Sequence, residues 1–268
     1  MKIKFYKYQG TGNDFVILDN REGYFSNLDT KQIRRLCDRR FGVGGDGLMI
    51  LNNKPGYDFE MLYFNSDGKP GSMCGNGGRC MIRFAYNIGI HKYTYKFMAS
   101  DGEHEAELDQ NNIVRLKMNN VIEVEEHSSY TILNTGSPHM VKFSTDVANV
   151  DVVETGREIR YNKRFVATGI NVNFVETTNQ DSIFVRTYER GVEDETLSCG
   201  TGVTAAALVS AHNPLGFNRV NVHTRGGRLS VEFNKINDSH FDNIWLCGPA
   251  EFVFSGEIEV KKTNDPIL

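Results

Sequence analysis

Residues 66–80 read SDGKPGSMCGNGGRC, and residues 193–208 read EDETLSCGTGVTAAAL. Each stretch places a cysteine, Cys74 or Cys199, directly before Gly-x-Gly and a run of residues with helical spacing. Asn65 precedes Cys74 by nine residues, and Arg190 precedes Cys199 by nine. The correspondence therefore extends back from the thiols into the preceding chain, and it predicts two copies of one structural unit.

The apolar pattern predicts the same order of elements in both halves. The first half begins with a strand in residues 1–15 and continues with strands at 57–64, 95–100, 103–109 and 113–118 and a helix from Cys74 to Gly89. The second half has a strand at 182–189, a helix starting at 198, a hairpin of 219–224 with 228–233, and a strand at 243–254. We expect an α+β fold of two mixed α/β domains, each a curved, mostly antiparallel sheet around a central helix. The boundary is expected near residues 118–129.

Composition narrows the classes of function. The chain has 268 residues, 40% of them apolar, and no apolar run of the roughly 18 residues that a membrane helix needs. Thirty basic and 34 acidic residues leave a net charge of −4 without charge blocks, so neither nucleic acid nor a membrane is an expected partner. Five scattered cysteines and no signal peptide at the start favour a reducing cytoplasm over a disulfide-linked or zinc-binding protein.

One short motif is rejected from its context. Residues 42–47, GVGGDG, satisfy the dinucleotide pattern G-x-G-x-x-G. That pattern needs a strand before it and a helix after it, so that the helix N-terminus meets the pyrophosphate. Here a helical stretch, residues 31–41, comes first and the apolar strand LMIL comes after. We interpret these glycines as a tight connection with positive φ angles.

The two cysteines are expected at helix N-termini. There the exposed N–H groups and the helix dipole favour a thiolate, and the same N–H groups can bind a carboxylate. Two equivalent thiols indicate a reaction with two equivalent sides. Inversion of a stereocentre is such a reaction: one thiolate removes the α-proton, and a thiol delivers a proton to the opposite face. The helix N-termini would stabilise the negative charge that develops on the carboxylate.

Seven blocks of the sequence, in order, resemble diaminopimelate epimerases from residue 10 to about 250. They are GTGNDFVILDN, FGVGGDG, FNSDGKPGSMCGNGGRC, GSPH, GINVNFV, YERGVEDETLSCGTG and GGRL. The resemblance implies interconversion of LL- and meso-2,6-diaminopimelate in bacterial lysine and cell-wall biosynthesis, without pyridoxal phosphate or a metal. It also implies a pseudo-twofold axis, an active site in the interdomain cleft, a possible homodimer, and domains of 1–118 (with about 257–268) and 119–256.

The resemblance also assigns residue roles. Cys74 and Cys199 are implied to be the base and the acid, with roles that exchange according to substrate stereochemistry. The reacting carboxylate would be held by the backbone N–H groups of Gly75, Asn76, Gly200 and Thr201. Substrate contacts are implied for Asn13, Asn65, Asn171, His139, Glu189 and Arg190. Arg190 suits the distal carboxylate because a guanidinium can bind it through two parallel hydrogen bonds. Ser137 replaces the Asn that many members carry in the GNPH block.

Two alternatives remain open from sequence. Proline or hydroxyproline racemases share the two opposed cysteines, but their first motif usually has His after Cys-Gly, where this chain has Asn76. The other alternative is a thiol redox or anion-binding protein that uses the helix N-termini without exchanging an α-proton.

Overall fold

The computed structural model describes residues 1–71 and 73–260. The chain separates into two compact units: unit 1 runs from Met1 to Leu116 and resumes at Pro249, and unit 2 runs from Lys117 to Gly248. From the sequence we expect the chain to rejoin the first half at about residue 257; in the structure it does so at Pro249, because the strand that follows pairs with the N-terminal strand along nearly its whole length. Residues 261–268 of that expected segment lie outside the described residues.

Among the described residues, unit 1 contains eight strands and two helices. In chain order these are β1 (Lys2–Gly10), β2 (Asn13–Asp19), α1 (Thr30–Cys37), β3 (Gly47–Asn52), β4 (Phe59–Asn65), α2 (Gly75–Asn87), β5 (Thr94–Ala99), β6 (Gly102–Leu108), β7 (Ile113–Lys117) and β17 (Glu251–Glu259). The sheet order is β17-β1-β2-β3-β4-β5-β6-β7, with parallel pairing only at β2–β3 and β4–β5.

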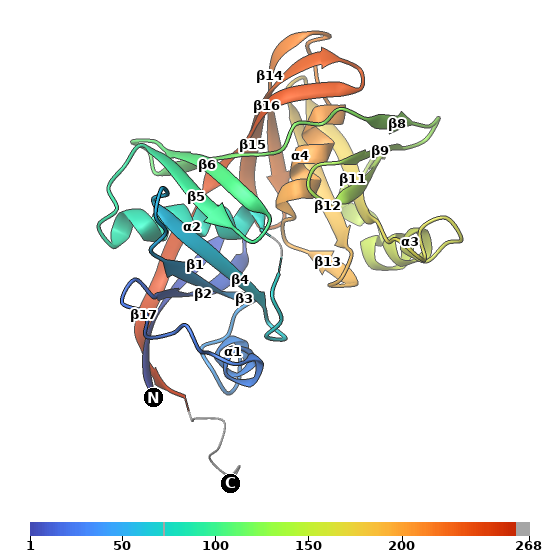
Figure 1. The fold of residues 1–268 in the computed structure, drawn as a ribbon. Helices are drawn as coiled ribbons and strands as arrows, with labels where there is room; N and C mark the ends of the chain where they lie inside the picture. The colour runs from blue at the N-terminus through green and yellow to red at the C-terminus, as the bar shows by residue number, and fades with distance from the viewer. Residues whose placement is uncertain (72, 261–268) are drawn as a thin grey trace. The chain divides into compact units, whose positions relative to one another are not determined.

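The curved sheet of unit 1 surrounds α2, which contacts β1, β2, β3, β6 and β17 (Figure 1). Residues 75–82 of the helix are all buried, as expected for a helix enclosed by sheet on most sides. The outer face of β2 and β3 is covered by α1, whose Ile33 and Leu36 join a second apolar cluster. Asp29 and Gln32 form a capping box at the start of α1, which stabilises its first turn.

Unit 2 contains nine of the described strands and two α-helices. They are β8 (Val124–Glu126), β9 (Thr131–Asn134), β10 (Pro138–Phe143), α3 (Val152–Arg160), β11 (Asn171–Asn179), β12 (Ser182–Glu189), β13 (Asp194–Thr196), α4 (Gly200–Val209), β14 (Gly216–Thr224), β15 (Gly227–Asn237) and β16 (His240–Pro249), with a 3-10 turn at Val147–Asn149. The sheet surrounds the Ala-rich helix α4, which contacts β9, β10, β11, β12, β14 and β15, while α3 covers the outside of β11 and β12 (Figure 1).

The two units have the same topology. Six successive strand pairings follow the same order in both units: antiparallel, parallel, antiparallel, parallel, antiparallel and antiparallel. They are β1–β2, β2–β3, β3–β4, β4–β5, β5–β6 and β6–β7 in unit 1, and β9–β10, β10–β11, β11–β12, β12–β14, β14–β15 and β15–β16 in unit 2. The central helix follows the fourth strand of the series in both units, as α2 after β4 and as α4 after β12. The fold class expected from the repeated cysteine motif is therefore confirmed.

Three local expectations are refined by the structure. Residues 1–15 form two strands, because Thr11 and Gly12 take positive φ angles of 52° and 85° and make a tight turn. Residues 243–254 also form two strands, β16 and β17, which meet at Pro249, a residue without an N–H to donate. The glycines at 42–47 form the expected connection between α1 and β3, where Gly44 has a φ of 83°.

Within the described ranges, none of the helices is long and apolar enough to span a bilayer.

Candidate active site

Cys74 lies at the N-terminus of α2, as the motif predicts. It is the N-cap residue, with extended backbone angles (φ −103°, ψ 127°), and its carbonyl accepts the N–H of Gly78 at 2.7 Å. The backbone N–H groups of the first helical turn, including those of Gly75 and Asn76, point out of the helix end. The half-buried thiol therefore lies beside a positive helix N-terminus.

Asn13 is held beside this thiol by Asp46. The Asn13 Nδ2 donates to Asp46 Oδ2 at 2.6 Å, which turns Asn13 Oδ1 toward Cys74 Sγ at 3.6 Å and Asn76 Nδ2 at 3.3 Å. Register places the three strand ends at one edge of the sheet: Phe15 of β2 pairs with Gly47 of β3, and Gly47 pairs with Asn65 of β4. Two predicted residues, Asn13 and Asn65, are thus on the edge of unit 1 from which α2 starts.

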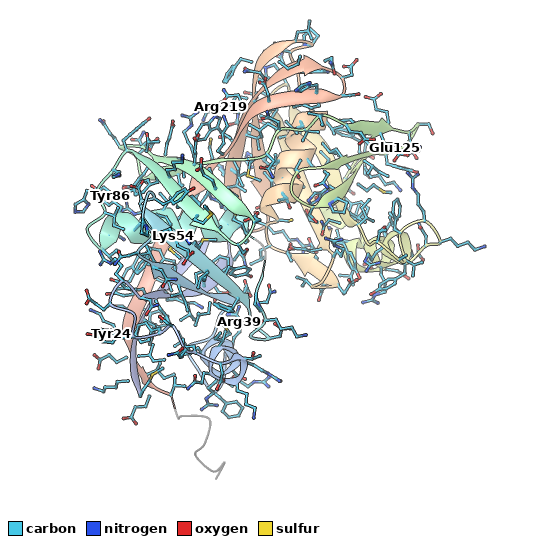
Figure 2. The ribbon with its side chains drawn as sticks, viewed as in Figure 1. Tyr24, Arg39, Lys54, Tyr86, Glu125 and Arg219 are labelled. Atoms are coloured by element: carbon cyan, nitrogen blue, oxygen red, sulfur yellow. The ribbon has the colours of Figure 1, made fainter. Side chains whose placement is uncertain are left out.

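A charged cluster supports Asn13 from behind. Asp14 contacts Lys7 Nζ and Arg39 Nη2, each at 2.6 Å, and Arg39 also contacts Asp46 at 2.7 Å; Arg39 is labelled in Figure 2. Burial by itself would raise the pKa of Asp14, but hydrogen bonds and charge from Arg39 and Lys7 outweigh it and hold that pKa well below its usual value. Lys7 is only 6% exposed and also donates to the Gly44 carbonyl.

Cys199 occupies the equivalent position at the N-terminus of α4. It is the N-cap residue with nearly the same backbone angles as Cys74 (φ −106°, ψ 112°), and its carbonyl accepts the N–H of Val203 at 2.8 Å. Its Sγ lies 3.5 Å from the Thr201 hydroxyl. Thr201 Oγ1 in turn lies 2.8 Å from Nε2 of His139, a residue with no solvent exposure.

His139 connects Thr201 to a buried amide. Its Nδ1 lies 3.2 Å from Asn173 Nδ2, which also donates to the Met140 carbonyl at 2.9 Å, while Asn173 Oδ1 accepts the Thr187 hydroxyl at 2.9 Å. Burial, with a smaller contribution from the positive charge of Arg190, lowers the pKa of His139 to about 3. The imidazole is therefore neutral at neutral pH, and it lies behind Thr201 rather than on the protein surface.

Arg190 and Asn171 are joined at the end of β12. The Arg190 N–H donates to Asn171 Oδ1 at 2.8 Å, and Asn171 Nδ2 donates to Ser137 Oγ at 2.9 Å. The guanidinium donates to the Thr168 carbonyl at 2.9 Å and to Ser137 Oγ at 3.3 Å. An arginine has five N–H donors, so these contacts orient the side chain and leave donors for an anion. Glu189, half-buried, is the last residue of β12.

The two half-sites share a backbone plan but differ in the side chains behind the helix start. Strand register gives the equivalent positions in the two units: Phe15 corresponds to His139, Met49 to Asn173, and Tyr63 to Thr187. The start of α2 thus packs on an apolar pair and the start of α4 on a polar network. The two thiols have equivalent positions and different chemical surroundings.

Sequence reasoning missed several residues that support the candidate site. Asp46 lies inside the glycine motif of residues 42–47, which the sequence indicates only as a tight connection. Asn173 alternates with Asn171 in GINVNFV, and this spacing places both side chains on one face of a strand. That spacing was the available signal for Asn173. No signal in the sequence links Thr187 or Arg39 to these residues.

The fold is shared with several solved structures. A phenazine biosynthesis protein of the PhzF family from Bacillus anthracis has a TM-score of 0.75 at 15% identity, with 97% of this chain and 100% of that chain covered. A hydroxyproline epimerase from Agrobacterium vitis, solved with trans-4-hydroxy-L-proline, has a TM-score of 0.70 at 13% identity, with 98% and 94% covered. The chain thus has the fold of the class that includes these proteins.

Sequence comparison narrows this class to one family. The family model described as diaminopimelate epimerase matches residues 5–124 and again residues 131–253, one match for each half of the chain. A diaminopimelate epimerase of Flavobacterium psychrophilum is 51% identical, with 96% of this chain and 100% of the relative covered. One from Chlorobaculum tepidum is 43% identical, with 93% and 98% covered. The chain belongs to the diaminopimelate epimerase family and is an isomerase, which confirms the resemblance drawn from the motifs.

Proposed function

We propose that this protein interconverts LL- and meso-2,6-diaminopimelate without pyridoxal phosphate, with Cys74 and Cys199 as the two acid–base groups. The observation that carries the proposal is the cysteine N-cap repeated at equivalent positions of two units with the same topology. The family relatives named diaminopimelate epimerase support the choice of substrate. The family resemblance drawn from the motifs further supports a role in bacterial lysine and peptidoglycan precursor biosynthesis, in the cytoplasm, and a homodimer.

In the proposed reaction the two cysteines together carry one thiol proton both before and after turnover. One cysteine thiolate takes the α-proton, so the C–H bond breaks and an S–H bond forms. The other cysteine thiol gives its proton to the opposite face of the planar carbon and becomes the thiolate. After one turnover the protonation states are exchanged, and the enzyme in that form is ready for the reverse epimer. The mechanism requires that both helix N-termini face one substrate carbon.

The backbone and Arg190 would hold the two ends of the substrate. The N–H groups of Gly75, Asn76, Gly200 and Thr201 would bind the reacting carboxylate, and their partial positive charge would stabilise the negative charge that builds up on it in the transition state. Arg190, held by Ser137 and Thr168, would bind the distal carboxylate. Asn13, Asn65, Asn171, His139 and Glu189 are proposed to line or support the same site.

The proposal is tested by solvent exchange. We expect that LL-diaminopimelate incubated with the reduced protein in deuterated water yields the meso isomer, with one deuterium at the inverted α-carbon. Mass spectrometry and chiral chromatography measure both. L-Proline and trans-4-hydroxy-L-proline serve as control substrates, and faster exchange of either one would favour the racemase alternative. The absence of both deuterium and meso product would refute the proposed activity.

A second prediction concerns the two cysteines. Replacing Cys74 or Cys199 by Ala should lower net epimerisation by at least about a hundredfold, because each removes one partner of the proton transfer. Cys247→Ala is a matched control, since Cys247 is a buried cysteine outside the candidate site; its turnover should stay within roughly twofold of the wild type at a temperature where it is folded. Normal turnover in either single variant at the helix starts would contradict a two-base mechanism.

A further inference from the structure

The two candidate thiols face hydrogen-bonding groups of different kinds, and the surrounding residues determine which group donates. At Cys74 an amide oxygen, Asn13 Oδ1, lies within hydrogen-bond distance of the sulfur. At Cys199 a hydroxyl, that of Thr201, lies within this distance, and a hydroxyl can donate or accept. The direction of the hydrogen bond at each sulfur can be worked out from the partners further away.

At Cys74 the direction is set by Asp46. An ionised carboxylate only accepts hydrogen bonds, so the Asn13 group that faces Asp46 Oδ2 at 2.6 Å must be the NH₂. Asn13 Oδ1 then faces Cys74, and it also accepts from Asn76 Nδ2. An amide oxygen cannot donate, so the hydrogen bond at Cys74 requires the S–H form of the cysteine.

At Cys199 the direction is set by the carbonyl of Met140. A carbonyl only accepts, so the Asn173 group that faces it at 2.9 Å must be the NH₂, and the Thr187 hydroxyl then donates to Asn173 Oδ1. The same NH₂ faces Nδ1 of His139, which must therefore be the unprotonated ring nitrogen. The neutral imidazole carries its proton on Nε2 and donates it to Thr201 Oγ1.

The Thr201 hydroxyl thus receives a hydrogen bond from His139, and its own proton is directed elsewhere. Cys199 Sγ lies at 3.5 Å, within hydrogen-bond distance for sulfur. A hydroxyl that donates to sulfur favours the thiolate over the thiol.

We propose that the two half-sites hold their thiols with opposite hydrogen-bond direction in the substrate-free protein: Cys74 donates to Asn13, and Cys199 accepts from Thr201. Asp46, through Asn13, and Asn173 with Thr187, through His139, are positioning residues for this arrangement. The catalytic meaning rests on the proposed function: the resting enzyme holds Cys199 as the base and Cys74 as the acid, so it is prepared for one of the two epimers and must exchange its protons to accept the other.

Charged groups lie near both thiols, and the test must hold them constant. On the elements around the start of α2 they are Lys7, Asp14, Arg39, Asp46 and Arg79. On those around the start of α4 they are Glu189, Arg190 and Asp194 and the ion pair of Arg186 with Glu195, whose atoms are 2.7 Å apart. Substitutions of one neutral side chain by another leave all of these charges in place.

The experiment measures alkylation of each thiol by iodoacetamide against pH, resolved by peptide mass spectrometry, in substrate-free Cys74→Ala and Cys199→Ala proteins. We expect Cys199 to reach its half-maximal rate at lower pH than Cys74. Adding Thr201→Val to Cys74→Ala should slow Cys199 alkylation at neutral pH by about tenfold, the effect of one hydrogen bond to a charged group, and Thr201→Ser should restore it. Adding Asn13→Leu to Cys199→Ala should shift the Cys74 profile to lower pH.

A second readout needs no cysteine variant. In the ¹⁵N-histidine NMR spectrum of the wild-type protein, His139 should be the neutral Nε2–H tautomer at neutral pH, and Asn173→Leu should abolish that preference. Equal profiles for the two cysteines, or an Nδ1–H tautomer of His139, would overturn the inference. Neither readout needs turnover: different profiles without epimerisation would refute only the proposed function, and epimerisation with equal profiles would refute only this inference.

Discussion

His139 illustrates how burial can decide the chemistry of a single residue. A lone histidine in the motif GSPH could be a charged group, a ligand or a structural residue, and the sequence does not distinguish these states. In the fold both ring nitrogens have partners, Thr201 on one side and Asn173 on the other, and burial lowers the pKa to about 3. The residue is a neutral donor on Nε2, which is how it can influence Cys199 through Thr201.

The depressed pKa of His139 predicts a pH dependence of stability. In the unfolded chain the imidazole has a pKa of about 6.5, so between pH 6.5 and about 3 the unfolded state binds one more proton than the folded state. Stability from this residue is complete above pH 6.5 and is lost as pH falls through that window. Replacing His139 by Gln should reduce the pH slope of the free energy of unfolding by about 1.4 kcal/mol per pH unit near pH 5.

Urea unfolding monitored by circular dichroism at pH 5 to 7 measures the slope. His91→Gln serves as the control, because His91 is exposed, and its slope should match that of the wild type. An unchanged slope in His139→Gln would mean that His139 is charged in the folded protein.

At the scale of the element, the starts of α2 and α4 are similar in backbone and different in neighbours. Gly77 and Gly202 occupy the same place, two residues after Gly75 and Gly200. A Cβ on Gly77 would lie 3.1 Å from the flexible end of Met49, whereas a Cβ on Gly202 would lie 2.3 Å from Asn173 Oδ1. The second contact is far too short, and Asn173 is held in place by three hydrogen bonds.

These two glycines form a matched pair for mutation. Gly202→Ala should lower the free energy of unfolding by roughly 2 kcal/mol, because the new methyl group must displace the Asn173 network. Gly77→Ala should change it by less than roughly 1 kcal/mol, since Met49 can move and alanine improves helix propensity. Chemical denaturation of both variants measures the difference. Equal losses of stability would show that the Asn173 hydrogen-bond network gives way to a new methyl group as readily as Met49 does.

At the scale of the whole molecule, the proposed reaction requires the two units to bring their cysteines to one substrate. Each unit has its own strands around its own central helix and its own apolar cluster. The candidate residues are divided between them. Unit 1 carries Asn13, Asn65, Cys74, Gly75 and Asn76, and unit 2 carries His139, Asn171, Glu189, Arg190, Cys199, Gly200 and Thr201. Neither half alone can invert a stereocentre by a two-base route.

Oxidation tests whether the two thiols share one site. Mild treatment with diamide should link Cys74 to Cys199 and abolish epimerisation, because the proposed mechanism brings both thiols to one substrate carbon. A disulfide needs Cα atoms roughly 4.4–6.8 Å apart, so the linkage reports that the two cysteines come close together. Peptide mapping identifies the linkage, and dithiothreitol should restore activity. Cys37, Cys80 and Cys247 are buried and lie outside the candidate site, away from the two helix starts, so they should stay reduced. Complete oxidant treatment without a Cys74–Cys199 peptide would contradict the shared site, as would activity in the linked protein.

Much of the fold could be predicted because it depends on local pattern. Alternating apolar residues specify strands, and Cys-Gly-x-Gly before a helical run specifies a helix start. Repetition of both patterns was enough to predict two copies of one unit. The breaks at Thr11 and Pro249 were missed because a continuous apolar pattern does not show where the backbone turns. The supporting residues Asp46, Asn173 and Thr187 were missed because each acts through a partner that is distant in sequence.

The sequence alone therefore determined the family, the duplicated fold and the two cysteines, since these depend on residue type and spacing along the chain. Only the tertiary structure decided how the two thiols differ. Strand register places Met49 behind one helix start and Asn173 behind the other, and burial makes the hydrogen bonds of Asn173 and His139 obligatory. The direction of a hydrogen bond depends on every donor and acceptor in its chain, and that chain exists only in the folded protein.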